Sequence, residues 1–511
     1  MKEAQTSAHG CFGIVAARLV LILAAFLANA LAGAGDPVNI HFTDVTLSAV
    51  GTSMDSTIGA ALGDFNGDGY LDIFCSEANK KSHLYMSFSP PAIVYQDAAL
   101  QSGLAFNAIG FDTNAIAWDF DNNGLLDLFV SHGSDNLHMV NEGNGTYLNY
   151  ALTSGLRVSG NTHSVTPIDF DRDGRQDLLI ACGAWNYGGP VYLMRNKGDG
   201  TFVNVTAAAG FGGIYVGGGG ALAVDFDLDG KTDICLVHYG GLRLYRNNGN
   251  GTFAELQNTG LEVAGYANGA AVGDYDNDGD MDIFVASNAP VKMFRNNLAE
   301  KGTLTFADTT TLAGVNDVLG AGADAAFGDM DNDGYLDLLV ATYKEFDSGK
   351  DYLYHNNGNG TFTDVTMSAG LTVPPFLDDT ACTFADLDND GRLDIITTGI
   401  NHGIVRNTST NTGHWLEIQL RGTRSNRDAV GAQVTLEAGG KRQYRQKLIG
   451  KPRGSQESPR LHFGLGDYNG PLTVRVLWPS GGTDAYHVAG VDRIVSLEQK
   501  PASVSEWSLF K

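Results

Sequence analysis

One pattern of apolar and polar positions recurs seven times along the chain. Each unit has a short apolar run, a loop with acidic residues at alternate positions around a Gly, and a second apolar run that begins with another Asp. The unit recurs every 49 to 57 residues, which fits a four-stranded β-propeller blade and is too long for leucine-rich or ankyrin repeats. The loops start at Asp64, Asp119, Asp169, Asp225, Asp274, Asp329 and Asp386.

The sixth unit shows the strands that we expect in each repeat. Residues 325–328 lead into the loop, residues 337–341 lead out of it, and residues 352–355 and 362–366 flank an Asn-Gly turn. Asn-Gly is a strong hairpin signal because both central residues must tolerate positive φ. We therefore predict an all-β, seven-bladed β-propeller with one blade per unit.

The two ends of the repeat region complement each other. The seventh unit stops at its third strand, residues 404–407, and no Phe-Thr-Asp-Val-Thr segment follows. That segment stands instead before the first loop, at residues 42–46, where it matches residues 362–366. We predict that it pairs into the last blade and closes the ring, because an open propeller would leave unpaired strand edges.

The chain divides into four predicted parts. An apolar run at residues 19–27, followed by small residues, indicates a secretory signal peptide that is cleaved after Ala32 or Ala34. A membrane anchor is the alternative, although the run is shorter than the roughly 20 residues that cross a bilayer. The predicted parts are a signal peptide at 1–34, the propeller at 38–408, a second β-domain at 409–500 and a tail at 501–511.

The composition is acidic and rich in Gly. A net charge of −25 argues against a nucleic-acid partner, and it indicates either a solvated acidic surface or a chain that collects cations. The chain has 66 Gly and only 13 Pro, which suits an all-β fold with many tight turns. Four cysteines beyond the signal peptide lack paired spacing, so we expect isolated buried thiols rather than a disulfide framework: Cys75, Cys182, Cys235 and Cys382.

The alternate acidic positions predict a cation in each loop. Counted from the first Asp, oxygen-bearing side chains stand at positions 1, 3, 5 and 9, Gly bends the chain at position 6, and in the first loop the Tyr70 carbonyl is available at position 7. Such a loop aims its oxygens at one centre, as Ca²⁺ requires, whereas Mg²⁺ demands a smaller octahedron. One loop alone would equally be an ordinary Asp-Gly turn, but seven in phase favour metal. The predicted ligands are Asp64, Asn66, Asp68, Tyr70 and Asp72; Asp119, Asp121, Asn123 and Asp127; Asp169, Asp171, Asp173 and Asp177; Asp225, Asp227, Asp229 and Asp233; Asp274, Asp276, Asp278 and Asp282; Asp329, Asp331, Asp333 and Asp337; and Asp386, Asp388, Asp390 and Asp394.

We expect about seven Ca²⁺ ions, bound with modest affinity. The loops are not EF-hands, because position 12, where that motif has a bidentate Glu, holds no acidic residue in any of them. Modest affinity is adequate where calcium is about millimolar, as it is outside the cell. This agrees with a signal peptide and with a secreted protein at the extracellular, cell-surface or periplasmic side.

The repeats resemble the FG-GAP and VCBS family of propeller repeats, which occurs in integrin α-subunit heads and in many secreted bacterial proteins. The resemblance rests on the pattern Asp-x-Asp-x-Asp-Gly-x-x-Asp, which runs in repeated form from Asp64 to Asp394. It implies a seven-bladed propeller with Ca²⁺ in the loops that join the first two strands of each blade.

The region after the repeats has a different composition. Residues 409–511 contain 14 Lys and Arg against 9 Asp and Glu, a net charge of +5, whereas the preceding residues sum to −30. Strand-like runs indicate a small β-sandwich-like domain; they lie at residues 415–420, 429–436, 461–464 and 472–478.

Four segments of this region resemble the ASPIC/UnbV domain, which follows such propellers in relatives of cartilage acidic protein. They are Ser425-Asn426-Arg427, Gly431-Ala432, His462-Phe463-Gly464-Leu465-Gly466 and Trp478-Pro479-Ser480-Gly481. The charged insert Lys451-Pro452-Arg453 departs from the small residues that family members tend to have there. The resemblance implies extracellular interaction roles and supplies no established reaction.

Two further groups of polar residues have open interpretations. A set at strand ends is either a ligand or catalytic ring on the face opposite the loops or an ordinary solvated edge. Residues 441–447, a basic stretch, could contact an anionic glycan, dock on the acidic propeller or form a solvated strand face. The strand-end set consists of Glu77, His132, Cys182 and His238 with Thr113, His163, Asn268 and Thr380.

The sequence favours a binding protein over an enzyme. It contains no nucleophile and base pair with local motif support, so no catalytic residue is assigned. We expect a secreted calcium-binding scaffold, monomeric and without a membrane span, that binds an extracellular protein or glycan. The alternative is a secreted or periplasmic polysaccharide lyase or hydrolase that uses the face opposite the calcium loops.

Overall fold

Each acidic loop joins two antiparallel strands. In all seven repeats the residue before the loop's first Asp pairs with the Asp at position 9, as Gly63 pairs with Asp72 and Gly328 with Asp337. The strands on both sides of the loop are buried along their length, because each sheet packs between two neighbours. This explains why they read as continuous apolar runs rather than as alternating ones.

The computed structural model describes residues 39–501, except residues 53, 55–56, 78–79, 89–91, 108–113, 132–135, 185–186, 218, 317, 319–321, 344–349, 372–376 and 402. The predicted signal peptide, and the predicted tail beyond residue 501, lie outside the described residues. The chain from Ile40 onward forms one compact unit. Among the described residues, no helix combines the length and the apolar character that a bilayer crossing needs.

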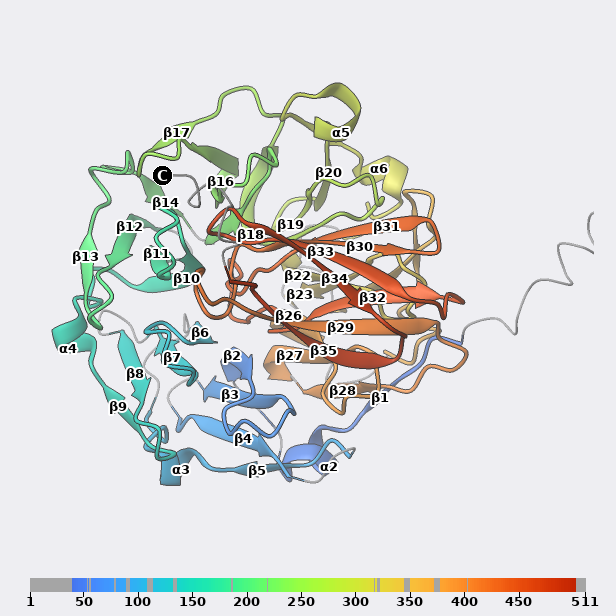
Figure 1. Ribbon diagram of the computed structural model, residues 1–511, viewed down its shortest axis with the longest axis horizontal. Helices are drawn as coiled ribbons and strands as arrows, with labels where there is room; N and C mark the ends of the chain where they lie inside the picture. The colour runs from blue at the N-terminus through green and yellow to red at the C-terminus, as the bar shows by residue number, and fades with distance from the viewer. Residues whose placement is uncertain are drawn as a thin grey trace, which may run out of the picture. The chain divides into compact units, whose positions relative to one another are not determined.

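The repeats form antiparallel sheets that follow one another around a common centre (Figure 1). Five of these sheets contain one repeat each, and a seven-stranded sheet joins the repeats of Asp225 and Asp274. Their strands are β1 (Phe42–Asp44), β2 (Thr57–Gly63), β3 (Asp72–Glu77), β4 (His83–Ser87), β5 (Tyr95–Asp97), β6 (Ala115–Trp118), β7 (Asp127–Val130), β8 (Leu137–Asn141), β9 (Tyr147–Asn149), β10 (Thr162–Ile168), β11 (Asp177–Ala184), β12 (Tyr187–Asn196), β13 (Phe202–Asn204), β14 (Tyr215–Val216), β15 (Ala221–Val224), β16 (Asp233–Asn247), β17 (Phe253–Glu255), β18 (Glu262–Gly273), β19 (Asp282–Ser287), β20 (Lys292–Asn296), β21 (Phe306–Asp308), β22 (Gly322–Gly328), β23 (Asp337–Thr342), β24 (Tyr352–Asn356), β25 (Phe362–Asp364), β26 (Leu377–Ala385), β27 (Asp394–Asn401) and β28 (Ile404–Asn407).

Short helical turns lie at the outer edge of the sheets. Four of them directly follow an outermost strand, and α5 precedes one. They are α2 (Thr46–Val50), α3 (Ala99–Ser102), α4 (Ala151–Ser154), α5 (Leu298–Lys301) and α6 (Thr310–Ala313).

The N-terminal strand closes the ring as predicted. Strand β1 pairs with β28 in antiparallel register, with Phe42 opposite Asn407. Strand β2 of the first repeat contacts β26 and β27 of the last repeat. One apolar cluster contains Ile73 of the first repeat and Ile396 of the last. Hydrophobic burial between the two ends of the repeat region therefore reinforces the backbone pairing.

The C-terminal region is a two-sheet domain with its own apolar core. One sheet has the order β32–β29–β35 and the other β31–β30–β33–β34, and a single cluster that includes Ile418, Val434, Val474 and Trp478 fills the space between them. The strands are β29 (His414–Arg421), β30 (Gln433–Ala438), β31 (Lys441–Gln446), β32 (Leu461–Gly466), β33 (Leu472–Leu477), β34 (Thr483–Val488) and β35 (Arg493–Glu498).

Two expectations for this domain need correction. The strand expected at residues 429–436 begins only at Gln433, because Ala429 adopts a φ of 54° in a turn. The sequence also does not predict β34 and β35, and a strand at residues 441–447, where β31 lies, is only one of three interpretations of that stretch. The expected β-sandwich-like fold is confirmed.

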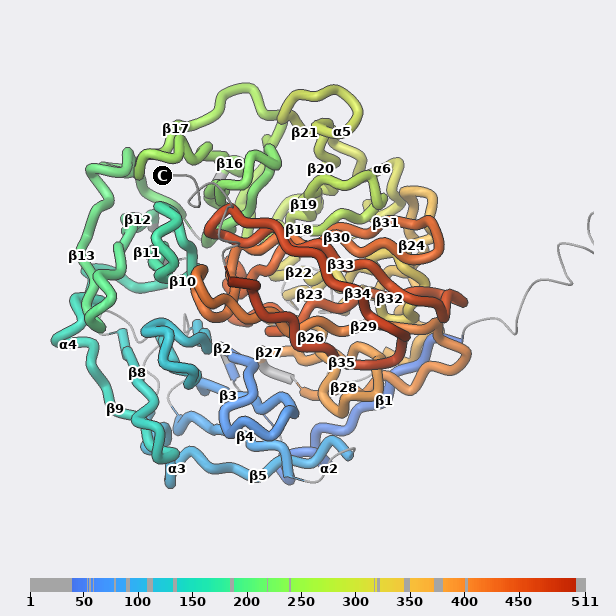
Figure 2. Tube along the Cα trace, in the orientation of Figure 1, coloured from blue at the N-terminus to red at the C-terminus, as the bar shows by residue number. Residues whose placement is uncertain are grey.

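A segment of the C-terminal domain enters the centre of the propeller. All residues from Ile449 to Gln456 are buried, and we call them the central segment. The Gly454 carbonyl accepts a hydrogen bond from the Ala60 amide at 2.8 Å, and the Gln456 side chain bonds both the amide and the carbonyl of Ala117. Figure 2 shows the C-terminal strands in front of β18, β22 and β26. The central segment thus joins the innermost strands of separate repeats.

The charged insert supplies a buried ion pair in this centre. Lys451 Nζ lies 2.9 Å from Asp324 Oδ2 on β22, and the two side chains are 1% and 0% exposed. The same ammonium group also donates to the carbonyl of Cys382 on β26. Because an unpaired charge here would face a strong desolvation penalty, each member of the pair requires the other.

Removal of either charge is expected to destabilise the whole unit. Lys451→Met should lower the free energy of unfolding by about 3–5 kcal/mol, because the Asp324 carboxylate loses its buried partner. Asp324→Asn should act in the same direction, and the double variant should lose clearly less than the sum of the two. Urea unfolding followed by circular dichroism measures these values, with the exposed Lys441→Met as the control. Additive losses would contradict the pairing.

Candidate metal centres

Two left-handed residues shape each acidic loop. The Gly at position 6 has a φ between 82° and 102° in all seven loops. Position 4 is also left-handed, which the sequence did not reveal, and it is Asn in four loops because Asn tolerates this conformation better than other side chains. The residues at position 4 are Gly67, Asn122, Arg172, Leu228, Asn277, Asn332 and Asn389.

The Asp at position 1 holds the loop in its bend. In the sixth loop Asp329 Oδ1 accepts the amide of Asp333 at 3.0 Å, and its Oδ2 accepts the amide of Gly334 at 2.9 Å. Asp64 and Asp386 make the equivalent bonds in the first and seventh loops. The first predicted ligand of each of these loops therefore also satisfies backbone donors that the bend leaves unpaired.

The Asp at position 9 is a buried connector as well as a predicted ligand. Asp233 Oδ1 accepts the amide of Asn247 on the third strand at 2.8 Å, and its Oδ2 accepts the amide of Phe226 at position 2. The bond from the third strand recurs in every repeat. This carboxylate ties the loop to the sheet below it.

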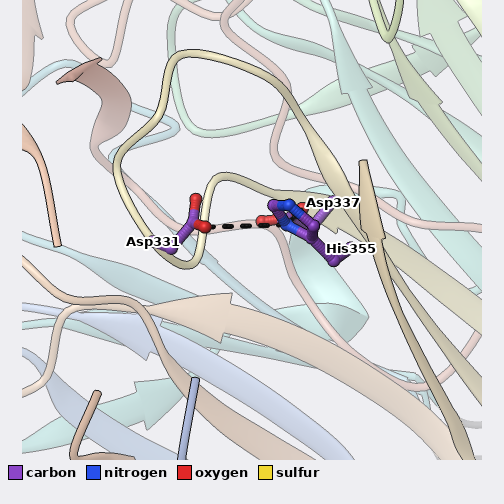
Figure 3. A group of neighbouring side chains, drawn as sticks. All are labelled: Asp331, Asp337 and His355. Atoms are coloured by element: carbon purple, nitrogen blue, oxygen red, sulfur yellow. Dashed lines mark hydrogen bonds and ion pairs between the residues drawn. The ribbon is translucent and has the colours of Figure 1, made fainter. Parts of the chain in front are cut away.

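Several predicted ligands lie close enough to share an ion. In the loops that start at Asp119, Asp169 and Asp274, carboxylate oxygens from positions 1, 3 and 9 lie within 4.8 Å of one another. In the loop of Asp225 the gathered positions are 1, 3 and 5, and in the sixth loop Asp331 and Asp337 gather with His355 (Figure 3). The ligand sets of all seven loops, including the Tyr70 carbonyl, stay predictions.

Burial raises the pKa values of these carboxyl groups. The pKa of Asp72, Asp119, Asp169 and Asp274 is raised to about 7, chiefly by desolvation and in addition by neighbouring carboxylates. Desolvation also raises the pKa of Asp127 to about 9. Ionised carboxylates are thus unfavourable here unless a proton or a cation offsets them.

Basic residues on the third strand offset part of the charge at position 3, a role that the sequence analysis missed. Arg195 lies 2.7 Å from Asp171 and Arg246 lies 2.6 Å from Asp227. Arg295, His355 and Arg406 make the corresponding pairs in the last three loops. The signal was present as an Arg-Asn pair that ends most third strands. In the first two repeats the corresponding residues are the uncharged Met86 and Val140.

The Asn of that pair connects neighbouring repeats. The buried Asn247 side chain donates to the carbonyl of Phe170 in the preceding loop at 3.0 Å and to the carbonyl of Thr232 in its own loop. Asn196, Asn296, Asn356 and Asn407 repeat this arrangement. The side chains that fix the loops relative to one another therefore lie outside the acidic motif.

The C-terminal domain contacts the loops directly. Gln446 exchanges two hydrogen bonds with the backbone of Asp225, and the Gly464 amide donates to Asp329 Oδ2 at 3.1 Å. Arg460 reaches Asn389 of the seventh loop at 2.6 Å. A side chain at Gly464 would lie 2.0 Å from the Asp329 carboxylate, which explains the Gly at this point.

The basic stretch at residues 441–447 docks on the propeller through its second half. Arg445, Gln446 and Lys447 are buried, whereas Lys441 and Arg442 are exposed. Of the three interpretations, docking on the acidic propeller is the one that the structure bears out for the buried residues.

The described members of the strand-end polar set are buried or half-buried. Glu77 pairs with His83 and Lys80, and Asn268 donates to the Gly322 carbonyl. Cys182 pairs with Thr162 as Glu77 pairs with Thr57, so it occupies the predicted register position, but its thiol lies in an apolar cluster. The other members are the buried His163 and the half-buried His238 and Thr380, while His132 and Thr113 lie outside the described residues.

The four cysteines behave as expected. Cys75, Cys182, Cys235 and Cys382 are free and buried. They contribute apolar volume to the cores between the sheets, and the fold depends on no covalent bridge between them.

Two family models match the chain. The FG-GAP-like repeat matches residues 119–180, 169–236, 225–285, 274–340 and 329–397, which together span more than half of the chain. The model described as ASPIC and UnbV matches residues 422–504. The chain therefore belongs to the family of FG-GAP-like repeat proteins, with an ASPIC and UnbV domain after the repeats.

Curated relatives carry the name cartilage acidic protein 1. The protein from Homo sapiens is 30% identical over 322 residues, which are 60% of this chain and 39% of the relative. The one from Mus musculus is 25% identical over 331 residues, 61% of this chain and 42% of the relative. The chain thus matches less than half the length of these relatives.

Solved structures share only the general fold. One is a lectin from Agrocybe aegerita that recognises non-reducing terminal N-acetylglucosamine; it is 19% identical, with a TM-score of 0.43, and the match covers 63% of this chain and 82% of the lectin chain. At this level of similarity, the ligand of the lectin says nothing about what this protein binds.

Without calcium, the protein is expected to lose stability as the pH rises from about 5 to about 8. Asp72, Asp119, Asp169 and Asp274 have a folded-state pKa of about 7, against about 3.9 for an unfolded Asp. Protonation therefore stabilises the folded state at low pH, and this contribution disappears as the pH passes the folded pKa. Thermal melts in chelator across this range measure the effect.

The matched comparison is the same pH series measured in the presence of calcium. Millimolar Ca²⁺ should flatten the decline, because a bound ion replaces the protons as the compensating charge. A melting temperature in chelator that is constant or rises between these pH values would show that the loop carboxyl groups do not titrate as described.

Proposed function

We propose that the protein is an extracellular binding scaffold whose propeller is stabilised by calcium in its seven acidic loops. The observation that carries this proposal is the close packing of buried carboxylates at the loops, with pKa values raised to about 7 by burial and by one another. A cation offsets such a cluster far better than water does. Oxygen-only ligand sets on a flexible bend suit Ca²⁺.

The third-strand basic residues support the proposal because they are too few to neutralise the loops. The loop of Asp169 has four acidic side chains, and the nearby cations Arg195 and Arg175 offset two of them. The first two loops have no basic residue at the third-strand position. We therefore place the greatest need for calcium in the loop of Asp64, because Arg427 of the C-terminal domain lies 3.3 Å from Asp119.

The partner is proposed to be an extracellular protein that contacts the outer edge of the propeller. Leu47, Leu100, Leu152 and Leu312 are 71–79% exposed, and each lies in the helical turn after an outermost strand. We call these four residues the rim leucines. Regularly spaced apolar side chains favour a protein over a glycan, and the C-terminal domain covers part of the loop side.

Calcium is expected to raise the melting temperature strongly and to bind at about seven ions per chain. Each site should add about 2.7 kcal/mol at a calcium concentration one hundred times its Kd. Melts in chelator and in calcium, together with elemental analysis of dialysed protein, measure both quantities. Asp121→Asn should remove about one ion, because Asp121 is an exposed member of a loop with an uncharged third-strand residue.

Glu437→Gln is the control for the loop variant, since Glu437 is an exposed acid outside the loops. It should leave the ion count and the calcium-dependent shift unchanged. An identical melt in chelator and in calcium, with no calcium retained, would remove the basis of the proposal.

The scaffold role is tested by capture from the native extracellular fluid in calcium. The triple variant Leu47→Glu, Leu100→Glu and Leu152→Glu should lose proteins that the unaltered chain retains, because charged side chains replace the apolar contact surface. Val203→Glu, on an exposed strand position, is the control and should retain them. Equal retention by the unaltered chain, the triple variant and the control would show that the partner binds away from the rim leucines or that there is no specific partner.

A further inference from the structure

The sixth repeat differs from its neighbours at the third-strand position next to the loop. Four other repeats have an arginine there: Arg195, Arg246, Arg295 and Arg406. The sixth repeat has His355, and its side chain is 25% exposed. Imidazole, unlike guanidinium, has a nitrogen lone pair and can bind a metal ion.

The imidazole points into the acidic loop (Figure 3). His355 Nδ1 lies 3.2 Å from Asp337 Oδ1 and 3.6 Å from Asp331 Oδ2. Two ligand atoms bound at 2.0–2.1 Å to a tetrahedral ion would lie roughly 3.4 Å apart. The two distances from the imidazole therefore match the coordination shell of a small divalent ion, and the ligand atoms of all three residues lie within 4.8 Å of one another.

A second observation indicates an unfilled ligand position. The Asp331 side chain is 3% exposed, and among the described residues its Oδ1 has no hydrogen-bond partner. A buried carboxylate oxygen without a donor is costly, and a bound ion would remove that cost. Asp337 is already oriented, because its Oδ1 accepts the amide of Asn356 at 2.8 Å.

We propose that the sixth loop binds a divalent first-row transition ion of the Zn²⁺ type through Asp331, Asp337 and His355 Nδ1. Calcium selects oxygen ligands, whereas an imidazole nitrogen together with carboxylates suits zinc and its neighbours in the series. The inference rests on the proposed function in that the loops are cation sites, and it replaces the calcium ion of this one loop, so that six loops keep calcium. An ion pair alone would be made equally well by arginine.

The test is a Zn²⁺ titration of the chain saturated with millimolar Ca²⁺, followed by calorimetry and repeated with Co²⁺ as an absorbing substitute. One equivalent should bind in the presence of calcium, and Co²⁺ should show the visible bands of a site with nitrogen and oxygen ligands. His355→Arg copies the neighbouring repeats and should abolish this binding. The decrease in zinc affinity should exceed the roughly 10–100-fold decrease that follows removal of a residue that only orients a metal ligand.

Two further variants accompany His355→Arg, one as a control and one as a second test of the zinc site. His414→Arg changes a histidine that pairs with the single carboxylate of Asp492, and it should leave zinc binding unchanged. Asp331→Asn keeps the shape of the loop and should weaken zinc binding if His355→Arg proves unstable. Melts of each variant in calcium report whether it is folded.

The outcomes separate this inference from the proposed function. Zinc binding that is unaffected by His355→Arg, or that calcium fully displaces, would overturn the transition-ion site and leave the calcium scaffold standing. Zinc binding through His355 in a chain that retains no calcium would support the site and overturn the calcium scaffold.

Discussion

The stability of the structure depends on offsetting the repulsion between the carboxylates that the fold brings together at the loops. Each loop needs its first Asp to bend the backbone and its ninth Asp to tie the loop to the third strand, as Asp329 and Asp337 do. Both roles require buried, hydrogen-bonded carboxyl groups. The same arrangement packs further acidic side chains around them, so that burial raises their pKa values. The loop carboxylates therefore need a proton or a cation to offset their charge.

Positive charge reaches the loops from several directions, and the loops differ in how much they receive. The third strand provides arginine in four repeats, and Arg427 of the C-terminal domain reaches Asp119 at 3.3 Å. Arg445, which is buried, lies near both Asp274 and Asp329. The first loop has neither of these but receives Arg460, which donates to the Gly69 carbonyl at 2.7 Å, and the sixth has the imidazole of His355. Sequence repeats that look equivalent thus present cation sites of different charge and chemistry.

The C-terminal domain packs into the centre of the propeller and against its loops. Its central segment hydrogen-bonds Ala60, Ala117 and Cys382 on the inner strands of three repeats, and Lys451 forms a buried ion pair there. Its β-sheets contact the loops through Gln446 and Gly464. The domain therefore occupies the centre and part of the loop side. The outer edge, with its exposed leucines, is left as a surface for partners, which is the role that we propose for it.

The sequence by itself determined the repeat, the loop motif and the closure of the ring, because these follow from fixed spacing and local periodicity. The pairing of Phe42 with Asn407 is the clearest case, since one missing strand matched one extra strand. Only the tertiary structure decided which groups meet across repeats: the bond from Asn247 to Phe170 and the docking of Gln446 on Asp225. These contacts join residues far apart in the chain. No periodicity encodes them, because they arise only when the ring has closed and the sheets have packed.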